Sequence, residues 1–469
     1  MSKTFVGARL RGLRKERGLS QASLAEALEI SPSYLNQIEH DVRPLSVPVL
    51  LKITDVFGVD TSFFNTQDQT RLIAELREVT MDVDANTSTE ELSDLARDHP
   101  GFARAMVALH RRYLGVADQL AQVTDGRNDP GARGSIPNPH EEVREFFYQR
   151  QNYFHELDTA AEELTARIRM HSSDVRTEIV TRLEAVHNVS IRRRVDLGES
   201  VLHRYDPRTR LLEINLHLSP GQQVFKMAAE LAYLECGRDI DALVDGAGFG
   251  SDEARTLARL GLANYYAAAV VLPYTHFHGA AEEFEYDIER LSAFFSVSYE
   301  TIAHRLSTLQ RPNLRGVPLS FVRVDRAGNM SKRQSSTGFH FSASGGTCPL
   351  WNVYETFAWP GKIITQIVEM PDGRNYLWVA RTVERRAARY GQPGKTFAIG
   401  IGCELRHAHR LVYARGLDLS DTNATPIGAG CRVCERAGCS QRAFPAIGKE
   451  LDIDEHRSTI SPYLVREAR

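Results

Sequence analysis

Residues 19–43, LSQASLAEALEISPSYLNQIEHDVR, decide the fold of the N-terminal part of the chain. Apolar residues recur at helical spacing on both sides of a break in the middle of this stretch; they are Leu24, Ala25, Leu28, Leu35 and Ile38. Ser20 and Ser31 stand where helix N-caps are expected, and Pro32 occupies a first helical position, where a missing N–H costs nothing. The pattern predicts two short helices joined by a sharp turn, inside a compact helical domain over residues 1–65.

Polar residues occupy the outward positions of the second of these helices. Asn and Gln can pair bidentately with adenine in the major groove, and a Gln at a helix N-terminus suits a phosphate. Basic residues between positions 9 and 17 add attraction to a DNA backbone. We therefore predict a DNA-reading surface made of Gln21, Ser33, Tyr34, Asn36 and Gln37. The alternative is a helical bundle whose polar face is merely solvated.

The stretch from residue 6 to residue 64 resembles the phage-repressor (XRE) type of helix-turn-helix. In that family the outward residues of the second helix touch bases, and the domains usually bind as dimers on two half-sites. The resemblance implies double-stranded operator DNA as a partner. It also implies a homodimer or a higher homo-oligomer.

The composition is that of a globular protein with about three domains. The chain has 469 residues, of which 42% are hydrophobic and 25% charged. A net charge of −3 excludes a uniformly basic nucleic-acid coat protein. The longest uncharged apolar run, residues 261–273, is shorter than the roughly 20 residues of a membrane-spanning helix. The basic N-terminus lacks the apolar core of a secretion signal. We expect a cytoplasmic protein without a membrane partner.

The rest of the chain is predicted to be mainly α, with an α+β C-terminal part. Residues 66–140 form a helical connector that ends in a linker rich in Gly, Pro, Asn and Asp. Helical spacing resumes over residues 141–310, interrupted by VSIRRRV, VLHRY and LLEINLHL, which we interpret as a small antiparallel meander. From residue 311 to residue 469, strand-like runs, glycine-rich turns and cysteines predict a mixed, Cys-rich domain.

Residues 222–237, QQVFKMAAELAYLECG, resemble the HExxH helix of the IrrE-like zinc peptidases. In HExxH two His bind Zn²⁺ on one helical face and the Glu acts as general base. Here Ala229 and Tyr233 stand at the His positions, only Glu230 remains, and residues 260–262 supply no carboxylate ligand. We therefore predict a degenerate peptidase fold over residues 141–310, with no catalytic residues and no enzymatic activity. The alternative is a functioning metallopeptidase, which a protease assay with added Zn²⁺ would detect.

Four cysteines with the spacing C-x27-C-x2-C-x4-C predict a metal site in the last domain. Thiolates are soft ligands that suit either Zn²⁺ or an iron–sulfur cluster, and spacing alone does not separate the two. His407 and His409 are possible substitutes for the first cysteine, whereas Cys236 and Cys348 are left outside the cluster. The predicted ligands are Cys403, Cys431, Cys434 and Cys439.

The order of the three domains resembles the short-chain fatty acyl-CoA regulator family over essentially the whole chain. The segments HRLSTLQRP, DRAGNMSKRQS and GAGCRVCE carry the most specific likeness. The resemblance implies a transcriptional regulator of acetate or propionate metabolism, in the glyoxylate or methylcitrate cycle. It further implies control by a short-chain acyl-CoA and a [4Fe–4S] cluster on the four cysteines. A structural-zinc transcription factor that senses no small molecule is the alternative.

An acyl-CoA needs cations for its phosphates and an aromatic or apolar slot for its adenine. The C-terminal domain offers candidates for both roles, although an Arg run is also typical of a solvated face and aromatic residues of a core. The candidates are Lys332, Arg333, Arg381, Arg385, Arg386, Arg389, Lys395 and Trp378.

Overall fold

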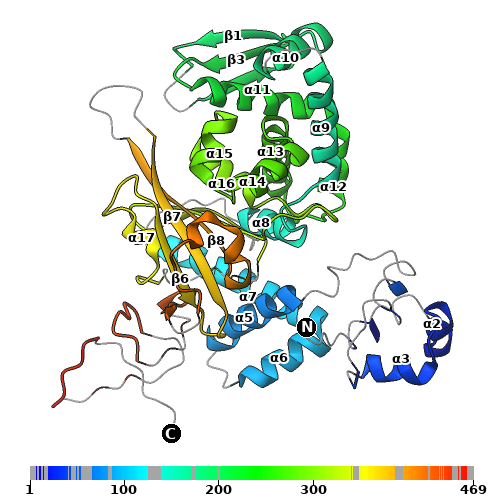
Figure 1. Cartoon of the computed structure of the whole chain (residues 1–469), viewed down its shortest axis with the longest axis vertical. Coiled ribbons are helices and arrows are strands. Elements are labelled where there is room, and N and C mark those ends of the chain that lie inside the picture. Colours follow the sequence, from blue (N-terminus) through cyan, green and yellow to red (C-terminus); the bar gives the residue numbers. More distant parts are fainter. Residues whose placement is uncertain are drawn as a thin grey trace. The chain divides into compact units, whose positions relative to one another are not determined.

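The computed structural model describes most of the chain (Figure 1). The described residues are 19–40, 66–82, 87–124, 139–170, 175–197, 201–337, 348–385 and 394–420, with shorter pieces between residues 7 and 53 and between residues 339 and 461. Most of the predicted linker, residues 125–138, lies outside them. The chain divides into two compact units, residues 1–114 and 115–469. Among the described helices, none is long and apolar enough to cross a membrane.

The first unit contains the two predicted short helices, α2 (Gln21–Ala27) and α3 (Pro32–Glu39). The Ser20 hydroxyl accepts a hydrogen bond from the Ser23 N–H, and the Ser31 hydroxyl accepts one from the Tyr34 N–H. The predicted caps are therefore confirmed. The apolar positions predicted from spacing, Leu24, Ala25, Leu28, Leu35 and Ile38, are all buried in one core.

Three further helices follow in the connector: α5 (Thr66–Asp82), α6 (Thr89–Asp98) and α7 (Pro100–Thr124). Ser88 and Glu91 form a capping box at the start of α6. The three helices share a small core that includes Leu76 of α5, Leu92 of α6 and Val107 of α7. The helices predicted for the connector are thus present.

The second unit starts with α8 (Pro139–Gln149), α9 (His155–Met170) and α10 (Val175–Thr181), which continues as a π-helical turn to Val186. Strands β1 (Ser190–Arg194), β2 (His203–Asp206) and β3 (Leu211–Asn215) follow. Their order is β1-β3-β2, and β1 pairs in parallel with β3 (Figure 1). The prediction of a purely antiparallel meander was wrong because β3, the most buried strand, inserts between the other two.

A helical layer packs beneath this sheet. It consists of α11 (Pro220–Glu235), α12 (Gly237–Asp245) and the long α13 (Asp252–Val271), which contacts α8, α9 and α11. Gly261 lets α13 approach α8, because a Cβ there would lie 2.9 Å from the Phe147 ring. The helices α14 (Tyr274–Glu283), α15 (Ile288–Phe295) and α16 (Tyr299–Leu306) come next.

The C-terminal part is built on a six-stranded sheet with the order β5-β4-β8-β7-β6-β9. The strands are β4 (Ser320–Asp325), β5 (Met330–Ser335), β6 (Ile364–Glu369), β7 (Asn375–Arg385), β8 (Lys395–Glu404) and β9 (Thr425–Pro426). All described pairings are antiparallel except that of β6 with β9. The α+β character predicted for this part is confirmed.

The two faces of this sheet belong to different cores. Because side chains alternate along a strand, Leu377 and Ile399 face one side and Trp378 and Ala398 the other. The first side packs against α14–α16, so its core crosses the predicted domain boundary at residue 310. The second side packs against the short helix α17 (Asn352–Glu355) and a group of aromatic rings.

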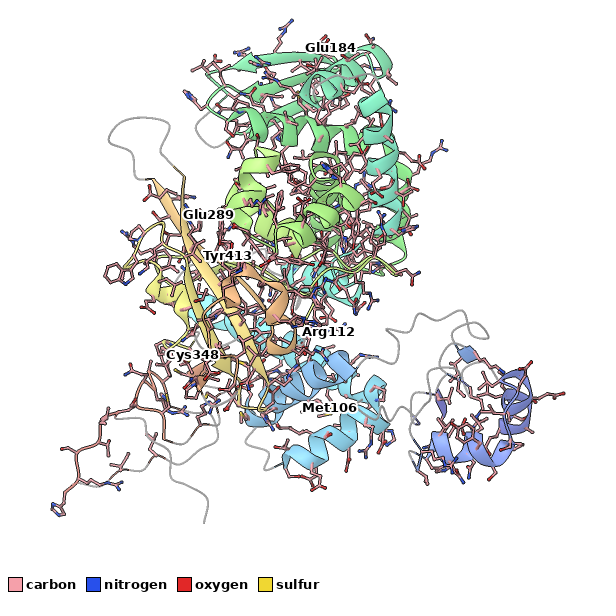
Figure 2. All side chains as sticks on the ribbon, viewed as in Figure 1. Met106, Arg112, Glu184, Glu289, Cys348 and Tyr413 are labelled. Atoms are coloured by element: carbon pink, nitrogen blue, oxygen red, sulfur yellow. The ribbon has the colours of Figure 1, made fainter. Side chains whose placement is uncertain are left out.

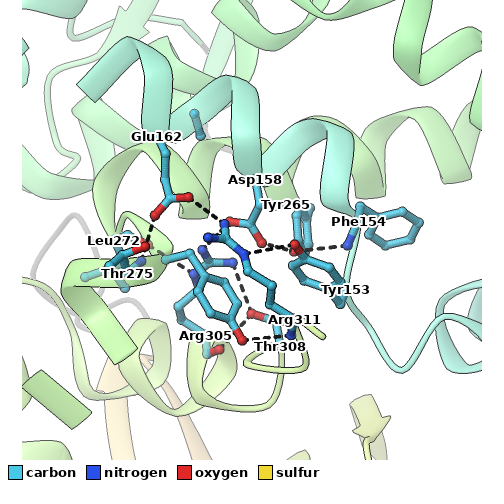
Figure 3. Close-up of polar contacts among 12 residues, drawn as sticks. Tyr153, Phe154, Asp158, Glu162, Tyr265, Leu272, Thr275, Arg305, Thr308 and Arg311 are labelled. Atoms are coloured by element: carbon cyan, nitrogen blue, oxygen red, sulfur yellow. Dashed lines mark hydrogen bonds and ion pairs between the residues drawn. The ribbon is translucent and has the colours of Figure 1, made fainter. Parts of the chain in front are cut away.

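A buried ion pair joins α9 to α16 in the second unit (Figure 3). Asp158 and Arg305 are both 0% exposed, and an Arg305 guanidinium nitrogen lies 2.5 Å from Asp158 Oδ1. The Tyr265 hydroxyl donates to the other Asp158 oxygen at 2.5 Å. Arg305 also donates to the Leu272 carbonyl and to the Thr308 hydroxyl, both at 3.1 Å. Every described member of this network therefore has a partner.

A second pair lies beside the first at the start of the C-terminal part. Arg311 donates to Glu162 at 2.6 Å and to the Tyr153 hydroxyl at 3.0 Å (Figure 3). Its guanidinium lies 4.1 Å from the centre of the Tyr274 ring. Glu162 also accepts the Thr275 N–H at 2.7 Å. Helix α9 therefore makes polar contacts with the segment that precedes α16 and with the segment that follows it.

Removing the charge of Asp158 should destabilise the second unit strongly. The Asp158→Asn variant leaves the Arg305 charge buried without a countercharge, which costs about 3–5 kcal/mol. Urea unfolding followed by circular dichroism measures the loss. Asp245→Asn removes an exposed carboxylate paired with Arg255 and should cost less than about 1 kcal/mol. Equal losses in the two variants would contradict the prediction.

Candidate functional site

The predicted DNA-reading residues lie together on one side of α2 and α3. Ser33 and Asn36 are exposed, whereas Gln21, Tyr34 and Gln37 are partly exposed. The Gln21 side-chain amide donates to Asn36 Oδ1 at 3.1 Å, so the first residue of α2 orients a residue in the middle of α3. This arrangement leaves the outward side chains of α3 accessible to the major groove of DNA.

A buried ion pair that sequence reasoning missed holds these helices in place. Glu39, at the end of α3, is 1% exposed and accepts hydrogen bonds from Arg14 at 2.6 and 3.1 Å. Its second oxygen also accepts from Gln21 at 3.0 Å. The hydrogen bond to Glu39 raises the pKa of Arg14, which therefore stabilises the domain rather than serving as a free cation for DNA. A lone Glu in a polar run gives no sequence signal of burial.

The remnant of the peptidase motif lies in the buried half of α11. Ser219 and Gln222 form a capping box that starts this helix. Ala229 is 5% exposed and Glu230 is 8% exposed, and both belong to the packed side of the helix. The Glu230 carboxyl lies 3.9 Å from the His203 ring on β2 and has no closer ionic partner among the described residues. Burial raises the pKa of Glu230 to about 7.

Glu230 should therefore make the stability of the second unit depend on pH. Because folding raises the pKa of this carboxyl, the folded state becomes less stable as the pH rises from 4.5, the pKa in the unfolded chain, to about 7, the pKa in the folded protein. Between pH 5 and pH 8, the free energy of unfolding of Glu230→Gln should rise relative to that of wild type by up to about 3 kcal/mol, measured by urea unfolding. The exposed Glu163→Gln should show no such gain, and a flat difference for Glu230→Gln would refute the assignment.

The structure brings together three of the four predicted cysteine ligands. Cys431, Cys434 and Cys439 line one hollow of the C-terminal part. The fourth cysteine of this hollow is Cys348, labelled in Figure 2, which sequence reasoning had left out. Gly428 belongs to the same wall and is required there, because a Cβ would lie 2.6 Å from the Cys434 sulfur.

Cys403 lies elsewhere. It is 0% exposed on β8, opposite Leu377 of β7, in the core that packs against α14–α16. Cys348 belongs to the core on the other face of the same sheet. Because the sheet separates the two, Cys403 is not brought to the hollow. The prediction rested on the spacing of the cysteines and on the family resemblance, and spacing carries no information about the face of a strand.

The loop that carries Cys431 and Cys434 is organised by a buried arginine. Arg442 is 4% exposed and donates to the carbonyls of Cys431 and Cys434 at 2.8 and 3.0 Å. The Ala443 N–H donates to the Cys431 sulfur at 3.5 Å. Burial raises the pKa of Cys434, while the Arg436 N–H and the charge of Arg442 act in the opposite direction.

The hollow is suited to a group bound by thiolates. Backbone N–H groups and cations around sulfur are what a thiolate-bound metal centre needs. Within the described residues no three metal-binding side chains stand at ligand spacing.

The predicted acyl-CoA cations are scattered rather than clustered. Arg333 on β5 pairs with Glu141 at 3.2 Å, and Arg381 on β7 pairs with Glu289 at 2.7 Å. Lys332 lies on β5, and Lys395 is exposed at the start of β8. Arg386, Arg389 and the side chain of Arg385 lie outside the described residues. Among the candidates that the structure describes, the cations are therefore not gathered into one phosphate site.

Trp378 is part of a buried aromatic group rather than an exposed surface. It is 0% exposed, its ring centre lies 4.7 Å from that of Trp351 and 4.9 Å from that of Phe339, and its ring fills the space left by Gly402. The indole nitrogens of Trp351 and Trp378 and the Tyr376 hydroxyl are buried without a hydrogen-bond partner among the described residues. Such groups cost about 1–3 kcal/mol each unless something pairs with them.

Comparisons with known proteins agree with this architecture. Residues 10–64 match the helix-turn-helix model, residues 184–307 the IrrE N-terminal-like domain, and residues 308–463 the short-chain fatty acyl coenzyme A regulator C-terminal model. The chain is 71% identical to the HTH-type transcriptional regulator RamB of Mycobacterium tuberculosis, with 100% of both chains covered.

Other relatives are more distant but extend over nearly the same length. The chain is 44% identical to the HTH-type transcriptional regulator PrpR of Mycobacterium tuberculosis, with 98% of this chain and 96% of PrpR covered. It is 40% identical to a propionyl-CoA carboxylase regulator of Cereibacter sphaeroides, with 98% of each covered. A solved Mycobacterium tuberculosis transcriptional regulator superposes with a TM-score of 0.67 at 46% identity, covering 70% of this chain and 100% of that chain. The chain therefore belongs to the short-chain fatty acyl-CoA regulator family of helix-turn-helix transcriptional regulators.

Proposed function

We propose that this regulator reads operator DNA as a homodimer in the cytoplasm and is controlled by a short-chain acyl-CoA and a [4Fe–4S] cluster. The observation that carries the proposal is the hollow lined by Cys348, Cys431, Cys434 and Cys439, together with buried polar groups that have no partner among the described residues. The regulated genes would serve acetate or propionate metabolism, in keeping with the propionyl-CoA carboxylase named in one relative. Peptidase activity is not proposed, because Ala229 and Tyr233 cannot ligate zinc as histidines do.

DNA recognition would rest on α3. Its partly or fully exposed residues Ser33, Tyr34, Asn36 and Gln37 carry the short polar groups that base reading needs. The buried Arg14–Glu39 pair fixes the angle between helix α3 and the preceding chain. The reading residues are thus presented by a rigid element, which is what a specific site requires.

Cys348 takes the place of Cys403 in the proposed ligand set. Cys348, Cys431, Cys434 and Cys439 share one hollow, whereas Cys403 lies across the sheet. When bound there, an iron–sulfur cluster would supply a redox-sensitive tie between chain segments about 80 residues apart. Burial raises the pKa of Cys434, and the Arg436 N–H and the charge of Arg442 offset only part of this effect. The Ala443 N–H donates to the Cys431 sulfur and would stabilise a bound thiolate there.

For the acyl-pantetheine part of the ligand we propose the aromatic group on the sheet, which is closely packed and would have to open to admit it. The indole N–H groups of Trp351 and Trp378 and the Tyr376 hydroxyl, which find no partner within the part of the chain that the structure describes, would donate to the thioester or amide carbonyls. The surrounding rings provide the apolar walls that a short acyl chain prefers. Trp378 would then act through its N–H and not by stacking on adenine.

The cluster site and the aromatic group are adjacent in the chain. The Cys348 carbonyl accepts a hydrogen bond from the Trp351 N–H at 3.2 Å, so movement of one residue displaces the other. Two ligands that bias one such element affect each other's affinity reciprocally. We infer that the acyl-CoA and redox inputs reinforce or oppose each other through residues 348–351.

A structural zinc site is the second candidate for the hollow. Four thiolates suit Zn²⁺ as well as iron, and such a site would stabilise the domain without providing a redox input. The relatives' names carry no information on the metal, so metal analysis decides between the two.

Gln37 should contribute to sequence-specific binding. Gln37→Ala should cost about 1–3 kcal/mol on the operator and little on random DNA, because a base contact is lost and phosphate contacts remain. Fluorescence anisotropy at fixed salt measures both affinities. Gln149→Ala, an exposed Gln on α8, is the matched control and should change neither. Equal losses on both DNAs would show that Gln37 does not read bases.

The cysteine assignment is tested by metal content after anaerobic purification. Wild-type protein should carry about four irons with matching sulfide. Cys348→Ser and Cys434→Ser should lose nearly all iron, whereas Cys403→Ser and Cys236→Ser should keep it, since neither thiol faces the hollow. Loss of iron in Cys403→Ser with retention in Cys348→Ser would restore the sequence-based ligand set. One zinc per chain without sulfide would favour the structural-zinc candidate.

A further inference from the structure

The side chains of Glu39, Gln21 and Asn36 form one hydrogen-bonded chain between α3 and α2. Gln21 Nε2 donates to Glu39 Oε2 at 3.0 Å and to Asn36 Oδ1 at 3.1 Å. Arg14 donates to both oxygens of Glu39, which is therefore an ionised carboxylate with acceptor oxygens only. The chain of hydrogen bonds thus begins at a buried ion pair and ends at the exposed side chain of Asn36.

These hydrogen bonds fix the orientation of both amides. The nitrogen and the oxygen of an amide have nearly the same shape, so the hydrogen-bond partners decide which way an amide lies. The Gln21 atom that faces Glu39 must be nitrogen, because two oxygens would repel each other. Both hydrogens of that nitrogen are then engaged, one by Glu39 and one by Asn36. The Asn36 atom that faces Gln21 must consequently be oxygen.

One acceptor and one donor are left for a ligand. Among the described residues, none donates to Gln21 Oε1 and none accepts from Asn36 Nδ2. Gln21 is partly exposed and Asn36 is exposed. Because a single hydrogen bond joins the two amides, this acceptor and this donor lie close together.

The side chain of Gln21 does not suit a phosphate in this arrangement. Phosphodiester oxygens only accept hydrogen bonds, and both side-chain donors of Gln21 are already engaged. The sequence favours a phosphate contact for a Gln at the start of a helix. The packing of α2 against α3 instead leaves this side chain with an acceptor, which a base can use and a phosphate cannot.

An acceptor beside a donor matches one base edge in the major groove. Adenine presents N7, an acceptor, next to its N6 amino group, a donor, whereas guanine presents two acceptors in N7 and O6. Thymine offers an acceptor and a methyl group, and cytosine offers a donor. Only adenine therefore pairs with both groups at once. Asn36 Nδ2 would donate to N7, and Gln21 Oε1 would accept from the N6 amino group.

We propose that Gln21 and Asn36 act together as one composite reader of an adenine in each half-site, with the buried ion pair holding its orientation. The inference rests on the proposed function for the premise that α3 enters the major groove. In the usual pairing a single Asn or Gln supplies both the donor and the acceptor. Here Gln21 determines specificity although it lies on α2.

The test removes single atoms from adenine. The full-length protein first selects its preferred sequence from random duplexes, and fluorescence anisotropy at fixed salt then measures its affinity. Two analogues are placed at each adenine of a half-site: 7-deazaadenine, which lacks the N7 acceptor, and purine, which lacks the N6 amino group. At one adenine, each analogue should weaken wild-type binding about 5-fold, because each leaves one group of the reader without its partner.

The variants distinguish a composite reader from a single one. Asn36→Ala should lose the 7-deazaadenine penalty and keep the purine penalty, because Glu39 still holds Gln21. The double variant Gln21→Ala/Asn36→Ala should lose both penalties. Glu26→Gln, at an exposed position of α2, is the control and should keep both. Circular dichroism checks that each variant is folded, and the result for Asn36→Ala decides by itself if the double variant is not.

Three outcomes would overturn the composite reader. Asn36→Ala could lose both penalties, which would make Asn36 the sole reader, or it could keep both. The folded double variant could keep the purine penalty, or no adenine could show both penalties in wild type. Sequence-specific binding persists in all of these cases, so the proposed function survives them. A protein that prefers no sequence over random DNA would refute the proposed function and this inference together.

Discussion

The buried pair of Asp158 and Arg305 is the interaction on which the second unit depends. Two charges removed from water are tolerated only when every donor and acceptor around them is satisfied. Here Tyr265, Thr308 and the Leu272 carbonyl complete the set. Burial alone would lower the pKa of Arg305, but the neighbouring carboxylate outweighs it and keeps the guanidinium charged. The peptidase-like helices and the C-terminal sheet are consequently one packed body.

This construction explains how a peptidase-like fold can persist without peptidase chemistry. Helix α11 retains its cap and its apolar side, and Glu230 remains buried in it, so the helix is still required by the core. Fold and chemistry are separable because packing depends on the many apolar residues of the helix, while zinc binding depends on the identity of a few residues at fixed positions, here Ala229 and Tyr233. The helices α14–α16 then provide one wall for the sheet that carries the proposed sensing residues.

The two faces of the C-terminal sheet have different roles. One face is filled by aliphatic side chains and by Cys403, and it attaches the sheet to the helices. The other face holds the aromatic group, α17 and Cys348, next to the hollow. A ligand or cluster on the second face can rearrange its surroundings while the first face stays packed. Close-packed cores respond to such changes by switching between arrangements and not by continuous deformation.

The sequence by itself determined the local features of this protein. Ser20, Ser31 and Pro32 placed the ends of α2 and α3, because capping and proline geometry act within a few residues. Helical spacing located α5 and α7, and the missing histidines at positions 229 and 233 identified a degenerate zinc motif. The resemblance of the full-length sequence to the short-chain fatty acyl-CoA regulators identified the family. These signals are short-range or are carried by residue identity alone.

Tertiary structure decided everything that depends on which face a residue occupies. Cys348 and Cys403 are separated by a sheet, and neither spacing nor composition reveals the partner strand that fixes this. The parallel pairing of β1 with β3, the burial of Glu39 by Arg14 and the burial of Trp378 under Gly402 likewise follow from contacts between distant segments. Such contacts form only when loop closure and packing are satisfied together, so no local pattern encodes them.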